Sequence, residues 1–163
     1  MTSPIDRLLA YQIEARHFPG ALVHIEQAGK ILAYQAVGLL GPESDEAMHE
    51  AAVFRLASLS KPIVSCAALM QVDEDRLALD APLGDYLPQL NDLRMKSGER
   101  PNRAPTVRDL LRHTSGLAYE LEIQDTELRE IFLRADLLGQ IPWIDREAFI
   151  DTLATLPLVG QPG

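Results

Sequence analysis

The feature that most constrains the fold of this chain is the segment Phe54–Lys61, which runs directly into a long apolar stretch. From Ser60 to about residue 73 the hydrophobic residues leave no polar stripe; they are Ile63, Val64, Cys66, Ala67, Ala68, Leu69, Met70 and Val72. The length suits a helix, and a helix that is apolar on all sides is normally buried between two layers. We therefore expect a helix packed on both sides, with Cys66 in the core.

Ser58 and Lys61 lie three residues apart at the start of this predicted helix. Residues with this spacing share one helix face, so the serine hydroxyl and the lysine amine can come within hydrogen-bonding reach. A serine needs a neighbouring base to act as a nucleophile, and a lysine in an apolar setting can serve because desolvation disfavours its charged form. The helix start also directs free N–H groups towards Ser58. Taken alone, the pattern is weak and is better explained by a capping serine followed by a solvated lysine.

The N-terminal part of the chain predicts one helix and one β-hairpin. Ser3 and Pro4 are typical of a helix start, and the apolar spacing continues that helix to about His17. Alternating polar and apolar residues predict strands over residues 21–27 and 31–37, joined by a tight turn. A helix and a hairpin followed by further helices indicate a sheet that is backed by helices.

After residue 60 every predicted element is helical. Helices are expected from Thr106 through Arg112 and over residues 128–135 and 149–153. We expect an α+β fold, in which residues 1–60 form the helix and hairpin and residues 61–163 form the nucleophile helix and a helical region. Two aromatic residues are interpreted as packing residues, namely Tyr34 and Trp143.

Composition and charge exclude several classes of function. A net charge of −9 with a pI near 4.8 leaves no basic face for nucleic acid. One cysteine forms no intrachain disulfide, and His17, His24 and His49 lack the spacing of metal ligands, so no metal or other cofactor is expected.

The chain shows no secretory leader and no apolar run of the ~20 residues that span a bilayer. We expect a cytoplasmic protein with no membrane partner, or a periplasmic one if a leader has been removed.

Four segments together are more informative than the serine and lysine alone. They are Gly20–Val23 with Gly29–Lys30, Phe54–Pro62, Leu77–Pro88 and Thr106–Leu117. In this order they resemble the class C β-lactamase-like serine hydrolases, which include penicillin-binding DD-peptidases and β-lactamase-fold carboxylesterases. The last segment departs from the family signature at Arg112, where a threonine is usual. The resemblance covers most of residues 20 to 117 and implies a partial β-lactamase/transpeptidase-like fold.

The resemblance also implies roles for individual residues. Ser58 would be the acylated nucleophile and Lys61 its proton-handling partner. Tyr119 would line the substrate-binding pocket, although packing alone also explains it. The family's general-base tyrosine follows a segment like Leu156–Gly163, so we expect that tyrosine and the strands that complete the sheet beyond residue 163. The chain is therefore interpreted as the N-terminal part of a longer enzyme.

His113 stands two residues before Ser115 and resembles a general base beside a nucleophile. In the family, however, the His-Thr-Ser-Gly signature is mainly a structural turn, and we interpret it in that way.

The sequence favours a serine hydrolase that forms an acyl-enzyme on carboxylic esters. The absence of an export signal favours esters over the extracytoplasmic substrates of a β-lactamase or DD-peptidase, which remains the first alternative. The second alternative is a non-catalytic binding or assembly module. An open apolar sheet edge invites pairing, so we expect a partner over it, either the missing C-terminal half or a second copy. The expected small-molecule partner is an ester or an amide.

Overall fold

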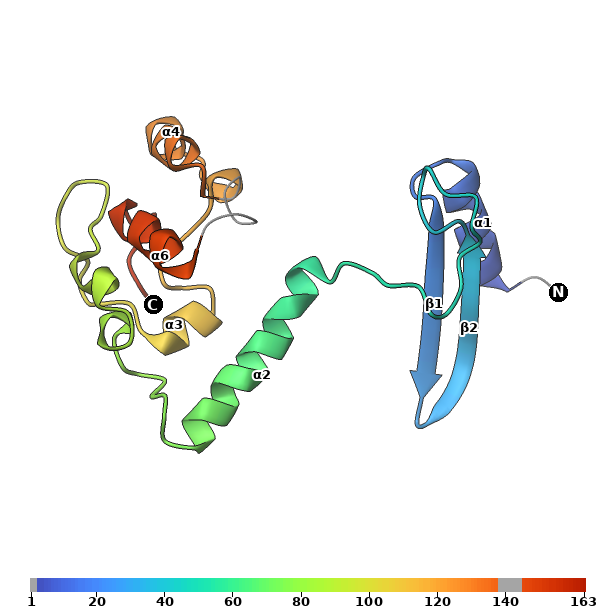
Figure 1. Cartoon of the computed structure of the whole chain (residues 1–163), viewed down its shortest axis with the longest axis horizontal. Helices are drawn as coiled ribbons and strands as arrows, with labels where there is room; N and C mark the ends of the chain where they lie inside the picture. The colour runs from blue at the N-terminus through green and yellow to red at the C-terminus, as the bar shows by residue number, and fades with distance from the viewer. Residues whose placement is uncertain (1–2, 138–144) are drawn as a thin grey trace. The chain divides into compact units, whose positions relative to one another are not determined.

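The structure is a computed structural model of the chain and describes residues 3–137 and 145–163. It divides into two compact units, Met1–Ala57 and Ser58–Gly163. The first unit holds a β-hairpin with a helix and the second holds helices (Figure 1). The prediction of a mixed fold with an N-terminal hairpin followed by helices is confirmed. Among the described helices, none has the length and apolar character needed to cross a bilayer.

The first unit is built from one helix and two strands. Helix α1 (Pro4–Glu14) begins with a capping box, in which the side chains of Ser3 and Asp6 each accept a hydrogen bond from the other residue's backbone N–H. Strands β1 (Gly20–Gln27) and β2 (Lys30–Gly38) pair antiparallel, with an irregularity between residues 25 and 26. The predicted helix start and both strands are confirmed, and the helix ends a few residues earlier than predicted.

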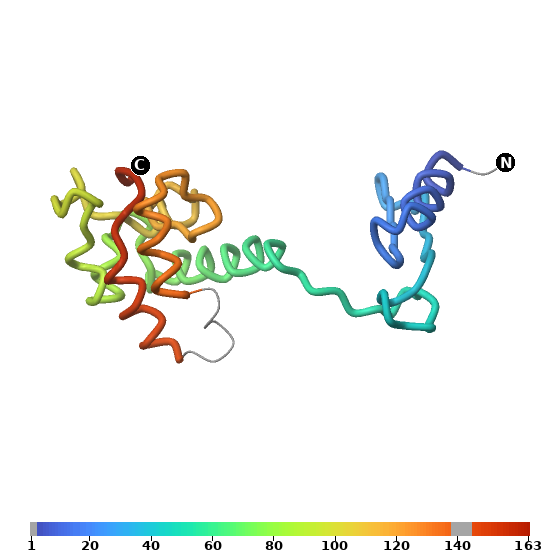
Figure 2. Tube along the Cα trace, turned by 90° about the horizontal axis from the view of Figure 1, so that it is seen from above, coloured from blue at the N-terminus to red at the C-terminus, as the bar shows by residue number. Residues whose placement is uncertain are grey.

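Helix α1 lies along the hairpin, as both Figure 1 and the turned view in Figure 2 show. The side chain of Gln35 on β2 donates a hydrogen bond to Asp6 of the helix, which ties the two elements together. Tyr34 is 44% exposed, and its ring meets His24 edge-on at 5.3 Å between centroids. The packing predicted for Tyr34 is therefore limited to a cross-strand contact, and Trp143 lies outside the described residues.

All the regular elements described in the second unit are helices or 3-10 turns, joined by irregular segments. Its elements are the 3-10 turns η1 (Ala57–Leu59), η2 (Leu83–Asp85), η3 (Pro88–Asp92) and η4 (Glu120–Glu122), and the helices α2 (Ser60–Asp73), α3 (Val107–Leu111), α4 (Thr126–Ala135) and α6 (Arg146–Thr155). Helices α2, α3 and α4 fall where the apolar spacing predicted them, and α6 contains the predicted residues 149–153 but extends beyond them at both ends. Aspartates cap α4 and α6 by accepting N–H groups of the first turn.

Two hydrophobic clusters hold the second unit together. One gathers around Leu158, which is fully buried, and contains Leu83, Leu90, Leu93 and Val107. The other consists of Ile123, Leu128, Phe132, Leu137 and Leu156. Because the segment 156–158 contributes to both clusters, it joins them. These clusters fix the loop between α3 and η4, where the candidate site lies.

The predicted burial of α2 is wrong for this structure. The helix forms over the expected residues, but none of them is buried, and Cys66 is exposed. Its large apolar side chains are 46–64% exposed, namely Ile63, Val64, Leu69 and Met70. Burial is supplied by neighbouring elements and not by the helix itself, and no described element covers these side chains.

Candidate active site

The Ser58 hydroxyl and the Lys61 amine form a direct contact. Ser58 lies in η1 and Lys61 in the first turn of α2, and the Lys61 Nζ donates a hydrogen bond of 2.9 Å to the Ser58 Oγ. The structure thus brings together the two residues that the spacing singled out. Both are exposed, so the apolar setting that the sequence predicted for the lysine is not found in this structure. The pair is correctly placed for proton transfer and is open to a small molecule.

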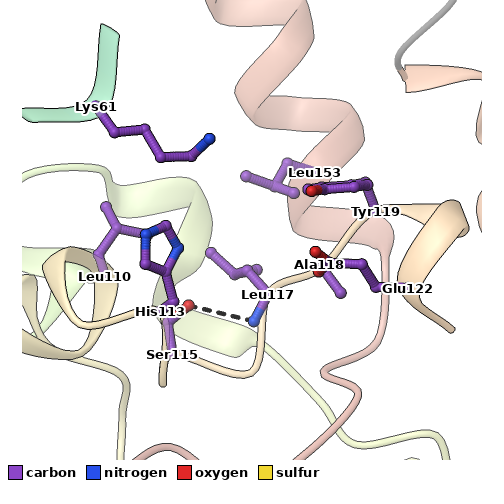
Figure 3. Close-up of a pocket in the computed structure, with 9 residues that line it drawn as sticks. All are labelled: Lys61, Leu110, His113, Ser115, Leu117, Ala118, Tyr119, Glu122 and Leu153. Atoms are coloured by element: carbon purple, nitrogen blue, oxygen red, sulfur yellow. Dashed lines mark hydrogen bonds between the residues drawn. The ribbon is translucent and has the colours of Figure 1, made fainter. Parts of the chain in front are cut away.

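A cavity of about 560 Å³ lies beside the Lys61 side chain. Lys61 reaches it from α2, and Tyr119 and Glu122 lie on a different side (Figure 3). The remaining lining residues come from α3, from the loop after it and from α6; they are Leu110, His113, Ser115, Leu117, Ala118 and Leu153. The walls are therefore partly apolar, with four ionisable side chains among them, and the volume suits a small molecule.

A tight turn after α3 shapes one wall of this cavity. The Thr114 N–H donates to the Asp109 carbonyl at 2.8 Å, and His113 has a left-handed backbone with a φ of 59°. Gly116 has a φ of 81°, and a Cβ at this position would lie 2.4 Å from the Gly160 carbonyl oxygen. The turn therefore requires glycine both for its conformation and for the close approach of the chain.

A buried carboxylate anchors the start of α3. Asp109 is only 4% exposed, and it accepts hydrogen bonds from the backbone N–H and hydroxyl of Thr106, each at 2.9 Å. Arg103 binds it through two nitrogens, one of them at 2.8 Å. The Arg103 hydrogen bonds, with a smaller contribution from Thr106, hold the pKa of Asp109 well below its usual range. The carboxylate thus stays ionised and fixes the helix that leads into the turn.

Removing this carboxylate should destabilise the second unit. We expect Asp109→Ala to lower the free energy of unfolding by about 3 kcal/mol, because it removes a helix cap and leaves Arg103 unpaired. Asp85→Ala, at an exposed position of the same unit, is the matched control and should change it by less than about 0.5 kcal/mol. Urea unfolding of the three proteins provides the measurement, and equal midpoints would contradict the anchoring role.

The lowered pKa of Asp109 also predicts a pH dependence of stability. In the unfolded chain an aspartate binds its proton near pH 4, and in the folded chain Asp109 does so only at lower pH. Its stabilisation is therefore complete above about pH 4 and is lost as the pH falls further. We expect Asp109→Asn, which does not titrate, to lose less stability on acidification than the native chain does. Parallel losses in both proteins would exclude Asp109 as the cause.

His113 and Ser115 do not form a catalytic pair in this structure. Ser115 is buried, and its hydroxyl accepts a hydrogen bond of 3.3 Å from the Leu117 N–H (dashed in Figure 3). Among the described residues no hydrogen bond joins His113 to Ser115. This arrangement favours the interpretation of the signature as a structural turn, with His113 as a lining residue of the cavity.

Tyr119 lines the cavity and is 40% exposed. A hydrogen bond to the carboxylate of Glu122, aided by the charge of that carboxylate, raises the pKa of the Tyr119 hydroxyl. The phenol therefore stays protonated at neutral pH and is poorly suited to accept a proton. Its position and chemistry fit a pocket wall better than a general base.

Some lining residues were not predicted from the sequence, among them Glu122 and Leu153. Glu122 belongs to η4 and Leu153 to α6, and neither stands in a motif or close to Lys61 in the chain. They reach the cavity through the packing of separate elements, so no local pattern signals them. Elsewhere in the described residues, no three His, Cys, Asp or Glu side chains gather as a metal site requires.

Comparison with known proteins identifies the family. A family model described as Beta-lactamase matches residues 5–163. The chain belongs to the beta-lactamase family. Esterase EstB of Burkholderia gladioli is 35% identical to it, in a match that covers 100% of this chain and 41% of EstB. Acyltransferase calJ of Penicillium decumbens is 32% identical, with 71% of this chain and 28% of calJ covered.

Solved structures agree with this assignment to the beta-lactamase family. EstCE1, described as a hydrolase with promiscuous acyltransferase activity, superposes with a TM-score of 0.79 at 26% identity. That match covers 97% of this chain and 40% of EstCE1. The simvastatin synthase LovD of Aspergillus terreus has the same fold, with a TM-score of 0.68 at 23% identity, covering 99% of this chain and 43% of LovD. The chain thus spans about two fifths of the length of EstB, EstCE1 and LovD.

Proposed function

We propose that this chain carries the nucleophile of a serine hydrolase that forms an acyl-enzyme on carboxylic esters. The observation that carries the proposal is the hydrogen bond of 2.9 Å between the Lys61 Nζ and the Ser58 Oγ beside an open cavity. The similarity to the esterase EstB and to the hydrolase EstCE1 supports an ester as the substrate. Ser58 is the proposed nucleophile, Lys61 the proposed proton carrier, and Tyr119 part of the proposed substrate-binding wall.

The proposed reaction has two halves. The Ser58 hydroxyl transfers its proton to the unprotonated form of the Lys61 amine while the oxygen attacks the ester carbonyl carbon. The carbon–oxygen bond to the alcohol breaks, the alcohol leaves with a proton, and Ser58 becomes acylated. Water then attacks the acyl group, and the serine recovers its proton as the acid is released. Because Ser58 lies two residues before the first residue of α2, the positive end of that helix lies near the reacting group and favours the negative charge that develops there.

The experiment that tests this proposal is covalent labelling with a fluorophosphonate. An activated serine displaces fluoride and retains the phosphonyl group, which mass spectrometry of the intact and digested protein locates. We expect one adduct per chain, on Ser58. An adduct on another residue, or none on the 163-residue chain, would contradict an activated Ser58 in this chain and would favour a non-catalytic binding or assembly module.

Acyl transfer to an alcohol is a second candidate, which the similarity to the acyltransferase calJ favours. An acyl-enzyme that reacts with an alcohol in place of water yields a new ester and no free acid. The two outcomes are separated by supplying a nitrophenyl ester with increasing concentrations of a primary alcohol. A new ester that grows at the expense of the acid would assign transferase activity, and acid alone would assign hydrolysis. Release of nitrophenol reports acylation in both cases.

A further inference from the structure

One wall of the cavity carries a carboxylate that forms no ion pair within the part of the chain that the structure describes. Glu122 is the last residue of η4 and lines this cavity. Among the described residues, no Lys, Arg or His nitrogen lies within 4.0 Å of its carboxylate, and its polar partner is the Tyr119 hydroxyl. The nearby Asp125, in contrast, is paired with Lys96 at 2.7 Å. The negative charge of Glu122 is thus available to a ligand in the cavity.

The two charged ends of the cavity differ in what they can bind. Lys61, beside Ser58, marks the side of the cavity at which the ester carbonyl would meet the proposed nucleophile. Tyr119 and Glu122 lie on a different side (Figure 3). A carboxylate next to an aromatic ring is a setting that attracts ammonium groups, through both the charge and the ring face.

We propose that Glu122 makes this cavity selective for esters that carry a positively charged ammonium group. The inference rests on the proposed acylation of Ser58, because the ester carbonyl then lies at the Lys61 side and its substituent extends towards Glu122. An ester that carries a carboxylate would be repelled by the same wall. The proposal thus assigns the substrate class from the charge at that wall.

The test compares two phosphonofluoridates of equal length, one ending in a trimethylammonium group and the other in an uncharged tert-butyl group. The rate at which each labels Ser58 is followed by intact mass at low and high salt. We expect the cationic probe to react about fivefold faster at low salt, with a smaller advantage at high salt because ions screen the attraction. Glu122→Gln should abolish the advantage while keeping a hydrogen-bond acceptor for Tyr119. Glu120→Gln, in the same turn but outside the cavity lining, is the matched control and should retain it.

Equal rates for the two probes in the native chain, or an advantage that survives Glu122→Gln, would overturn the assignment to Glu122. If neither probe labels Ser58, the proposed acylation fails, and reversible binding then decides the charge selectivity. In that case, a trimethylammonium alcohol should shift the amide NMR signals of residues 117–122 more than its tert-butyl analogue does, in the native chain and not in Glu122→Gln. Equal shifts with both alcohols would overturn the proposal.

Discussion

Replacing Ser58 by alanine should abolish covalent labelling by a fluorophosphonate and lower the rate of nitrophenol release by at least about 10⁴-fold. The reason is that the Ser58 Oγ is the atom that forms the new bond, and no other hydroxyl contacts the Lys61 amine among the described residues. The substitution removes an exposed hydroxyl, so the free energy of unfolding should stay within about 0.5 kcal/mol of the native value. Intact mass, burst kinetics with a nitrophenyl ester and urea unfolding provide the three measurements.

Ser60→Ala is the matched control for this experiment. Ser60 begins α2 only two residues beyond Ser58 and is also exposed, but among the described residues its hydroxyl makes no hydrogen bond with Lys61, and it does not line the cavity. We expect Ser60→Ala to label at close to the native rate. A nitrophenol burst that persists in Ser58→Ala would refute the assignment of the nucleophile, whatever the behaviour of the control.

Replacing Lys61 should have the second largest effect. We expect Lys61→Met to slow acylation of Ser58 by about 10³-fold, within the range of general acid–base catalysis. Methionine keeps much of the length of the side chain but cannot carry a proton. The rate of labelling by an uncharged fluorophosphonate provides the measurement, because it reports the reactivity of Ser58 without a later hydrolysis step.

Lys61→Arg separates proton transfer from fixed charge. Arginine retains the positive charge and can donate to the Ser58 Oγ, but it stays protonated in proteins and cannot accept the serine proton. We expect Lys61→Arg to be nearly as slow as Lys61→Met. Near-native labelling in Lys61→Arg would show that the charge and not a proton transfer activates Ser58, and the proposed role of Lys61 would be wrong.

The Ser58–Lys61 contact could be predicted from the sequence because it is local. Residues three apart in a helical segment meet whatever the rest of the chain does, and the structure places the two atoms at 2.9 Å. The capping boxes at Ser3 and Thr106 are local in the same sense, since each is completed within three residues. Such features depend on backbone geometry that a short segment determines by itself.

The surroundings of that contact could not be predicted in the same way. The apolar composition of α2 predicted burial, yet none of its residues is buried, because burial depends on neighbours that the helix does not encode. The cavity wall at Glu122 and Leu153 comes from two elements with no shared motif. Its position follows from how the hydrophobic clusters around Leu158 and Phe132 bring these elements together.

The helices, the hairpin and the serine–lysine pair could be predicted from the sequence by itself, because each depends on the spacing of residues close together in the chain. The family could be predicted because its motifs occur in the expected order along the chain. Only the tertiary structure decided that Glu122 and Leu153 join the cavity lining and that, among the described residues, no cation pairs with Glu122. The physical reason is that the lining residues of a cavity, and the electrostatic potential inside it, depend on packing between residues far apart in the sequence. No single segment of the chain determines that packing.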